Sequence, residues 1–248
     1  PCINVANGVG LYDGTVGDHD PEFGATYVRP YRYTEGAKCP NFLKFLGDCW
    51  GQDPDYKDKV TALQQALCAT LLGYAPRFQR AFLLIGKAKT GKSVLLKIIG
   101  GLFPDAARAS VSFSQLQDGN MMVSLDNKLI NIVGELSERQ RIRGDLFKGL
   151  IDGSPIMVRR LYKEAFNMVP VCAHWGASNH LPKTDDSSQG FTRRWLMFKF
   201  TRPVEDSEVD VNLADKILLE EREGVFTWAL QALPSLMKEN ADYVLPSS

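Results

Sequence analysis

Residues 86–93, with the sequence GKAKTGKS, form the segment best suited to bind phosphate. The segment matches the pattern GxxxxGK[ST], whose glycines let the backbone fold around phosphates with several N–H groups pointing inward. Lys92 would reach the β- and γ-phosphates, and the Ser93 hydroxyl would hold Mg²⁺. A glycine turn without a ligand is the alternative, but the apolar run before the segment and the helical pattern after it favour a phosphate loop. The predicted ATP-binding residues are Gly86, Lys87, Ala88, Lys89, Thr90, Gly91, Lys92, Ser93 and Val94.

A phosphate loop of this type works with a carboxylate on a neighbouring strand, which holds Mg²⁺ and orients water. Glu135 follows the apolar run 129–133, at the kind of strand end where open α/β sheets place their ligands. Glu138 is a second candidate, or else a surface residue. Gly134 stands where an Asp-Glu doublet would have its first acid. A single carboxylate must therefore do most of the work, unless another acid enters from elsewhere.

The elements that must position these residues follow from the apolar pattern. Strands are expected at 81–85, 129–133, 171–177 and 195–200, and helices at 40–50, 58–73, from Lys92 onward, and at 145–151. Residues 213–238 are expected to be mostly helical, with Pro234 ending or kinking the helix. Strands that alternate with helices indicate an α/β fold with a largely parallel sheet. Asn179 would then end a strand that lies between the other two catalytic strands.

Composition excludes several classes of protein. The chain has 248 residues, 44% of them hydrophobic, which is sufficient for a globular core. The formal net charge is zero, so any contact with nucleic acid must come from local basic clusters. The five cysteines are scattered and no CxxC occurs, which argues against zinc and disulfides and favours a reducing cytoplasm. No run is long enough to span a membrane, and we expect no membrane contact. Because the chain begins at Pro1, we expect it to be a fragment of a longer protein.

The order of several motifs resembles a known family. The phosphate loop is followed by IVGELSE, FKGLIDGSPIMVRRLYKEAFNMVP, GASNHLP and GFTRRWLMFKF. This order resembles that of the superfamily 3 helicases, specifically the helicase part of phage and plasmid primase–helicases related to the poxvirus primase–helicase. The flanking segments NGVGLYDG, CPNFLKFL and LLEEREGVFTWALQAL resemble the same family. The resemblance implies an AAA+-like phosphate-loop NTPase core at 77–204, a strand and helical accessory region at 1–76, and a helical segment at 205–248.

The resemblance also implies roles for residues around the phosphate. Asn179 matches the polar sensor that contacts the γ-phosphate or the attacking water, although it could simply open the turn before Pro182. Arg193 and Arg194 match the arginine-finger region, with Arg194 preferred because it directly precedes the last strand; a solvated basic pair at a strand start is the alternative. A finger of this kind reaches the γ-phosphate of a neighbouring subunit, which requires a ring, and the family's rings are mostly hexamers. The implied catalytic set is Lys92, Glu135, Asn179, Arg193 and Arg194, with Ser93 and Glu135 at the metal.

A hairpin that contacts DNA is implied between the acid and the sensor. The residues expected to bind single-stranded DNA are Arg159, Arg160, Tyr162 and Lys163. The cations would neutralise phosphates and Tyr162 could stack on a base; a solvated basic surface is the alternative. Ser154 stands where the family commonly has Asp, so either Asp152 substitutes or that contact is absent. The role of Lys148 stays open, and the aromatic residues Phe42, Phe45 and Trp50 are expected to pack a helical layer.

The sequence thus favours an ATP-driven, ring-forming DNA helicase from the replication protein of a phage or mobile element, working in the host cytoplasm. An initiator that uses ATP only to assemble on DNA is a binding-module alternative, which the incomplete acidic motif keeps open. A small-molecule kinase would need an acceptor pocket and a lid, for which the sequence shows no candidate.

Overall fold

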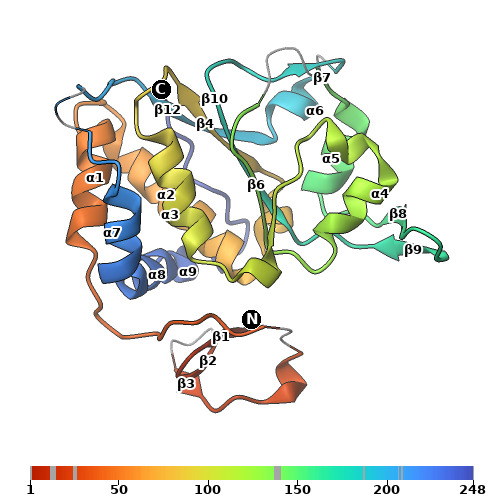
Figure 1. The fold of residues 1–248 in the computed structure, drawn as a ribbon, viewed down its shortest axis with the longest axis horizontal. Helices are drawn as coiled ribbons and strands as arrows, with labels where there is room; N and C mark the ends of the chain where they lie inside the picture. The colour runs from red at the N-terminus through yellow and green to blue at the C-terminus, as the bar shows by residue number, and fades with distance from the viewer. Residues whose placement is uncertain are drawn as a thin grey trace.

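The chain is described by a computed structural model that covers residues 2–11, 15–24, 27–136, 141–186, 188–205, 207 and 209–247. A central sheet separates two groups of helices, and a small N-terminal sheet lies at one end of the molecule (Figure 1). Among these residues, no helix is both long and apolar enough to span a membrane.

Five parallel strands form the central sheet, in the order β12-β4-β10-β6-β5. Their bounds are β4 (Ala81–Gly86), β5 (Arg108–Ala109), β6 (Ile130–Val133), β10 (Ala173–Ser178) and β12 (Trp195–Phe200). All four predicted strands are confirmed, and the short β5, which the sequence did not indicate, extends one edge. Because β10 pairs with both β4 and β6, the strand that leads to Asn179 lies between the other two, as predicted.

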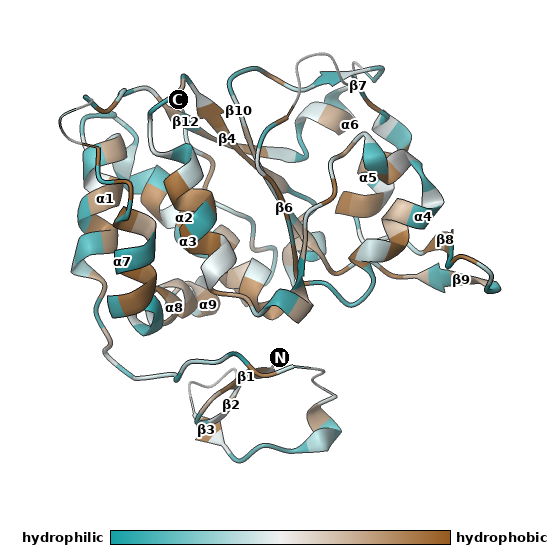
Figure 2. Cartoon of the chain, viewed as in Figure 1, coloured by the Kyte–Doolittle hydropathy of each residue, from teal (hydrophilic) through white to brown (hydrophobic). Residues whose placement is uncertain are grey.

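The sheet is buried on both faces. Along β4, Phe82 and Leu84 belong to one hydrophobic cluster, whereas Ala81 and Leu83 belong to the other. Successive side chains of a strand point to opposite faces, so a continuous apolar run suits a strand covered on both sides. In Figure 2 β4 and β12 are accordingly coloured as largely hydrophobic.

Helices from distant parts of the chain cover the two faces. The first face packs against α1 (Pro40–Trp50), α2 (Tyr56–Leu72), α3 (Lys92–Gly101), α7 (Leu213–Glu220), α8 (Arg222–Leu230) and α9 (Leu233–Leu236). The second packs against α4 (Gly119–Met122), α5 (Gly144–Ile151) and α6 (Gln189–Thr192). Helices from residues 1–76 and 205–248 therefore share one hydrophobic cluster with the sheet.

The predicted helix ends are confirmed within two residues in the first half of the chain. The helix expected at 40–50 is α1, and that expected at 58–73 is α2. Gly73 caps α2 in the left-handed conformation, with a φ of 69°, and its N–H donates to Ala69 O and Thr70 O. Glycine adopts this conformation without the steric penalty that a side chain brings, which explains why the helix ends there.

The C-terminal helical segment differs from the prediction. Residues 213–238 form three helices, and Pro234 lies in the first turn of α9, so it opens a helix instead of ending one. Proline is tolerated there because the first turn leaves its N–H groups without partners inside the helix. The chain also breaks at Glu221, whose carboxylate accepts hydrogen bonds from Asn41 N and Phe42 N, both at 2.9 Å. Glu221 thus caps α1 from the other end of the sequence.

Short elements complete the fold. The N-terminal sheet contains β1 (Cys2–Val5), β2 (Gly8–Leu11) and β3 (Val16–Gly17), and two further pairs join β7 (Arg141–Ile142) to β11 (Lys183–Thr184) and β8 (Ile156–Arg159) to β9 (Ala165–Met168). The 3₁₀ helices are η1 (Pro21–Phe23), η2 (Ala75–Phe78), η3 (Asp105–Ala107), η4 (Gln115–Gln117) and η5 (Val123–Leu125). The antiparallel β8–β9 hairpin falls where the sequence predicted one.

Candidate functional site

The loop at residues 86–93 joins β4 to α3, as the sequence predicted. Gly86 has a φ of 154° and Gly91, the N-cap of α3, has a φ of 95°. A Cβ at Gly86 would overlap the carbonyl oxygen of Phe200, and a Cβ at Gly91 would lie 2.9 Å from Cys49 Sγ. Both positions therefore need glycine, for conformation and for space.

The side chain of Lys92 forms hydrogen bonds to other residues of its own loop. Its ammonium group donates hydrogen bonds to Gly86 O at 2.6 Å, to Lys87 O, and to Thr90 Oγ1 at 3.4 Å. Burial lowers the pKa of Lys92, and the negative charge of Glu135 opposes that shift. The loop thus holds a cation at its centre, whose hydrogen-bond partners among the described residues are neutral oxygens; it lies at the N-terminus of α3, where the helix dipole also favours an anion.

Glu135 and Asn179 reach the same edge of the sheet as this loop. Glu135 lies two residues beyond β6, and the next residue, Leu136, donates its N–H to Ala177 O on β10 at 2.9 Å. Asn179 directly follows β10. Because the three strands are adjacent and parallel, their carboxyl ends bring the loop, the carboxylate and the amide around one cavity of about 690 Å³. A volume of this size suits a bound small molecule.

The donor set fits a magnesium ion. Ser93 lies in the first turn of α3 with an exposed side chain, and Glu135 is exposed just beyond the end of β6. Both line the cavity. Hydroxyl and carboxylate oxygens are ligands that Mg²⁺ prefers, usually together with phosphate oxygens. Glu138, the second candidate acid, lies outside the described residues.

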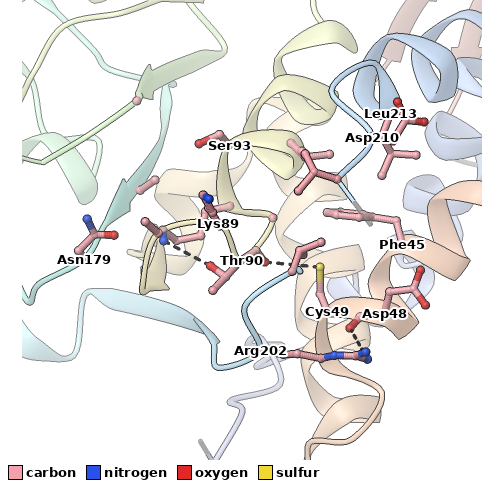
Figure 3. A pocket seen from close by; sticks show the side chains of 18 of the residues that line it. Phe45, Asp48, Cys49, Lys89, Thr90, Ser93, Asn179, Arg202, Asp210 and Leu213 are labelled. Atoms are coloured by element: carbon pink, nitrogen blue, oxygen red, sulfur yellow. Dashed lines mark hydrogen bonds between the residues drawn. The ribbon is translucent and has the colours of Figure 1, made fainter. Parts of the chain in front are cut away.

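The far side of the cavity comes from two segments that sequence reasoning did not assign to it. Figure 3 shows Asn179 on one side of the loop and Phe45, Asp48 and Leu213 on the other. The residues from α1 are Lys44, Phe45, Asp48 and Cys49, and those after β12 are Arg202, Val204, Val209, Asp210 and Leu213. The pattern of α1 indicated only packing, because Phe45 has the helical spacing of a core residue.

These two segments also hold the loop in place. The N–H of Val204 donates to Lys89 O at 2.8 Å, and Cys49 Sγ lies 3.8 Å from Thr90 O, as a weak hydrogen bond. Burial raises the pKa of the Cys49 thiol to about 12, so this cysteine stays protonated and can donate. The accessory helix α1 is therefore part of the wall of the site.

The arginine pair lies at the opposite edge of the sheet. Arg194 O accepts from Ala81 N at 2.7 Å, at the start of β4, whereas the loop follows the end of β4. Five rises of roughly 3.3 Å separate the two edges by roughly 17 Å. Arg193 is exposed, and its Nη2 donates to Gln79 Oε1 at 3.2 Å.

Arg194 does not project from the surface, contrary to what its preferred finger role requires. It is 6% exposed, and its guanidinium donates to both carboxylate oxygens of Asp152, at 2.8 Å and 2.5 Å. A third hydrogen bond runs from its Nη1 to Gly190 O at 2.5 Å. A planar guanidinium matches a carboxylate in this paired geometry, so Asp152 holds Arg194 inside the chain.

The four residues expected to bind DNA lie at or near the tip of the β8–β9 hairpin, and all are exposed. Tyr162 is 95% exposed in the left-handed conformation, with a φ of 59°. Arg160 differs from the others because its guanidinium is committed to the protein. It donates to Asp126 at 2.6 Å and lies 5.2 Å from the ring centre of Phe166. Figure 1 shows this hairpin projecting from the side of the molecule.

Comparison with known proteins agrees with the fold. Residues 84–194 match a family described as "Family of unknown function (DUF5906)". No curated protein matches the chain. Solved structures of the NrS-1 C-terminal region are similar: "The A form apo structure of NrS-1 C terminal region-CTR" has a TM-score of 0.59 at 20% identity, over 82% of this chain and 50% of that one. "The apo structure of NrS-1 C terminal region (305-718)" has a TM-score of 0.59 at 19% identity, with the same coverage.

A third structure, "The A form apo structure of NrS-1 C terminal region-CTR(305-718)", has a TM-score of 0.57 at 18% identity, over 88% of this chain and 51% of that one. The chain thus spans about half the length of these structures, and at such identities the similarity establishes a shared fold.

Proposed function

We propose that this chain is the ATP-driven motor domain of a phage or mobile-element replication protein, which hydrolyses ATP between subunits of a ring and moves along single-stranded DNA. The observation that carries the proposal is the convergence of Lys92, Ser93, Glu135 and Asn179 on one cavity. The ordered motifs resemble those of superfamily 3 helicases, which favours a helicase motor over other phosphate-loop enzymes. The fold shared with the NrS-1 C-terminal region is compatible with this proposal.

Lys92 would bind the phosphates by exchanging partners. In the described conformation its ammonium group satisfies the carbonyls of its own loop. A triphosphate in the loop offers charged oxygens in their place, and such hydrogen bonds are stronger than those to neutral carbonyls. The backbone N–H groups at the start of α3 would bind the same phosphates.

The chemical step would be in-line attack of water on the γ-phosphate. Glu135 would orient and polarise that water, and Asn179 would contact the water or the γ-phosphate from the neighbouring strand end. Mg²⁺, held by Ser93 and Glu135, would neutralise charge that develops on the phosphate oxygens. Lys92, Ser93, Glu135 and Asn179 all line the cavity at one edge of the sheet, which would set their spacing before the substrate arrives.

An arginine would complete the site from a neighbouring subunit. Neither Arg193 nor Arg194 can serve its own cavity, because both lie at the opposite edge of the sheet. Arg193 suits the role better than Arg194, since its guanidinium is exposed. Arginine fingers raise rates by about 10³ to 10⁵. The hairpin would bind single-stranded DNA through Arg159, Tyr162 and Lys163.

The decisive experiment measures ATPase activity with and without single-stranded DNA. The variants are Lys92→Ala and Arg193→Ala, alone and mixed, with Lys97→Ala as a matched control. Lys97 lies on the same helix α3 but pairs with Asp215 at the surface, 2.7 Å away. We expect stimulation by DNA in the wild type, no activity in either variant alone, partial recovery on mixing, and wild-type activity for Lys97→Ala.

Recovery would arise because mixing creates interfaces that pair an intact Lys92 with an intact Arg193. A wild type that hydrolyses ATP slowly, without a response to DNA, would instead favour the second candidate, an initiator that uses ATP only to assemble on DNA. Gly134 is the observation behind that candidate, because it leaves Glu135 without an adjacent acid. A wild type that neither binds nor hydrolyses ATP would refute both.

A further inference from the structure

Helix α5 and the segment 183–194 are joined by a line of contacts. It begins where β7 pairs with β11 and Thr184 Oγ1 donates to Ile142 O at 3.0 Å. Next, the N–H of Gly144 donates to Asp185 Oδ1 at 2.9 Å. The remaining contacts are an ion pair between Lys148 and Asp186 and the paired hydrogen bonds between Asp152 and Arg194. The contacts therefore occur in the same order along residues 142–152 as along residues 184–194.

Two α5 residues and Asp152, which caps the end of α5, make these contacts from one side of the helix. Gly144, Lys148 and Asp152 are four residues apart, and this spacing repeats on nearly the same face of an α-helix. Gly144 fits because a Cβ there would overlap Asp186. We refer to Gly144, Lys148 and Asp152, with their partners Asp185, Asp186 and Arg194, as the α5 clasp.

Aromatic packing reinforces the clasp from inside. Phe147 of α5 stacks on Trp195, with ring centres 4.7 Å apart, and contacts Phe191 at 4.9 Å. All three side chains are at most 6% exposed. Close packing of this kind, combined with the Asp152–Arg194 ion pair, attaches α5 firmly to the described residues around Phe191 and Trp195.

The clasp lies downstream of both catalytic strands. The chain that leaves β6 through Glu135 leads to β7 and α5, whereas the chain that leaves β10 through Asn179 leads to β11 and residues 183–194. At the Asp152–Arg194 end, the clasp lies next to two further elements of the fold. Asp152 is four residues before β8, the first strand of the hairpin, and Arg194 directly precedes β12.

We propose that Asp152 is a positioning residue, which locks the hairpin base to the segment after Asn179 so that nucleotide in the cavity changes the affinity of the hairpin for single-stranded DNA. This inference rests on the proposed function. Asp152 acts through Arg194 and the course of the backbone, since it touches neither the cavity nor the hairpin tip. Coupling requires that both ends of the clasp move together, which its internal contacts enforce.

The test compares the affinity for a fluorescent oligothymidylate with and without a non-hydrolysable ATP analogue. In the wild type we expect the analogue to change DNA affinity at least about fivefold, the lower end of typical couplings between sites. We call the DNA affinity with the analogue divided by that without it the coupling ratio. In Asp152→Asn we expect this ratio to lie within about twofold of unity, while affinity for the analogue itself stays within about twofold of wild type. Asp152→Glu, which keeps the charge, should recover part of the coupling.

Asp145→Asn is the matched control. It makes the same change at the other end of α5, where Asp145 pairs with Arg143 at the exposed start of the helix. This variant should keep the wild-type ratio. Should Asp152→Asn melt below the assay temperature, Lys148→Met breaks the clasp one turn earlier, at a more exposed position, and should lower the ratio in the same way.

The outcomes separate this inference from the proposed function. A wild type that binds neither the analogue nor DNA overturns the proposed function and the coupling with it. A wild type that binds both with a ratio near unity overturns only the coupling. Folded Asp152→Asn or Lys148→Met that keeps the wild-type ratio overturns the role of the clasp, because a purely structural pair would lower stability without changing that ratio.

Discussion

Replacing Arg194 by methionine should lower the stability of the protein, because the Arg194 side chain acts inside the chain and not in catalysis. The change removes the guanidinium but leaves the Asp152 carboxylate, whose side chain is only 22% exposed, without its partner. Breaking a buried ion pair from one side costs about 3–5 kcal/mol, and the partial exposure of Asp152 favours the lower value. In a chain of this size 1 kcal/mol shifts the melting temperature by about 2–4 °C, so we expect a loss of about 6–12 °C.

The assay is thermal unfolding followed by circular dichroism, with two matched variants. Arg193→Met removes the same charge one residue earlier, from an exposed side chain, and should change stability by no more than about 0.5 kcal/mol. The double variant Asp152→Leu with Arg194→Met should recover most of the loss, because replacing both members of a buried pair by apolar residues is often close to neutral.

One result would refute this reasoning. Suppose that Arg194→Met melts at the same temperature as the wild type but loses ATPase activity. The guanidinium would then not be needed for stability, and the result would support Arg194 as the arginine finger. The structural account requires the reverse pattern, with Arg193→Met stable but inactive and Arg194→Met unstable.

Three further predictions concern pH, metal and DNA. Burial lowers the pKa of His174 to about 4, so its contribution to stability is complete above its unfolded pKa of about 6.5 and is lost as pH falls toward 4. Urea unfolding should therefore show that the free energy of unfolding falls between pH 7 and pH 4 by about 3 kcal/mol more in the wild type than in His174→Gln. Gly134→Asp should fold, since a Cβ there meets nothing within 4 Å, and its second acid should lower the Mg²⁺ concentration for half-maximal ATPase severalfold, which Gly134→Asn should not. Arg159→Met should reduce the salt slope of single-stranded DNA binding by about 0.7, the value for one lost phosphate contact. Arg160→Met should leave that slope unchanged and lower the melting temperature by about 2–4 °C, because its guanidinium packs on Phe166.

Local patterns in the sequence were sufficient to predict much of the fold. The apolar runs that became β4, β6, β10 and β12 each carry enough buried residues to define a strand without reference to the rest of the chain. The resemblance to superfamily 3 helicases implies a hairpin between the acid and the sensor, and β8 and β9 form one there. The expectation that Asn179 ends a strand between the other two catalytic strands is also confirmed, since β10 pairs with both β4 and β6.

Contacts between distant residues were not predictable in the same way. Phe45 has the spacing of a core residue, and nothing in its neighbourhood indicates that α1 would pack against a loop some forty residues later. Glu221 lies in a helical pattern, yet its carboxylate caps α1 about 180 residues away, and that contact breaks the predicted long helix. Each of these features is fixed by tertiary packing, which overrides local propensity.

The arginine pair shows the same limit most clearly, and it also constrains how the proposed motor must be built. The sequence favoured Arg194 only because it directly precedes the strand, whereas in the structure its pairing with Asp152, 42 residues away, buries it and leaves Arg193 exposed. The sheet then separates both from the cavity by the full length of β4, roughly 17 Å. An exposed Arg193 can therefore contribute to ATP hydrolysis only in the cavity of another chain, so under the proposed function one chain alone holds half of each of two active sites.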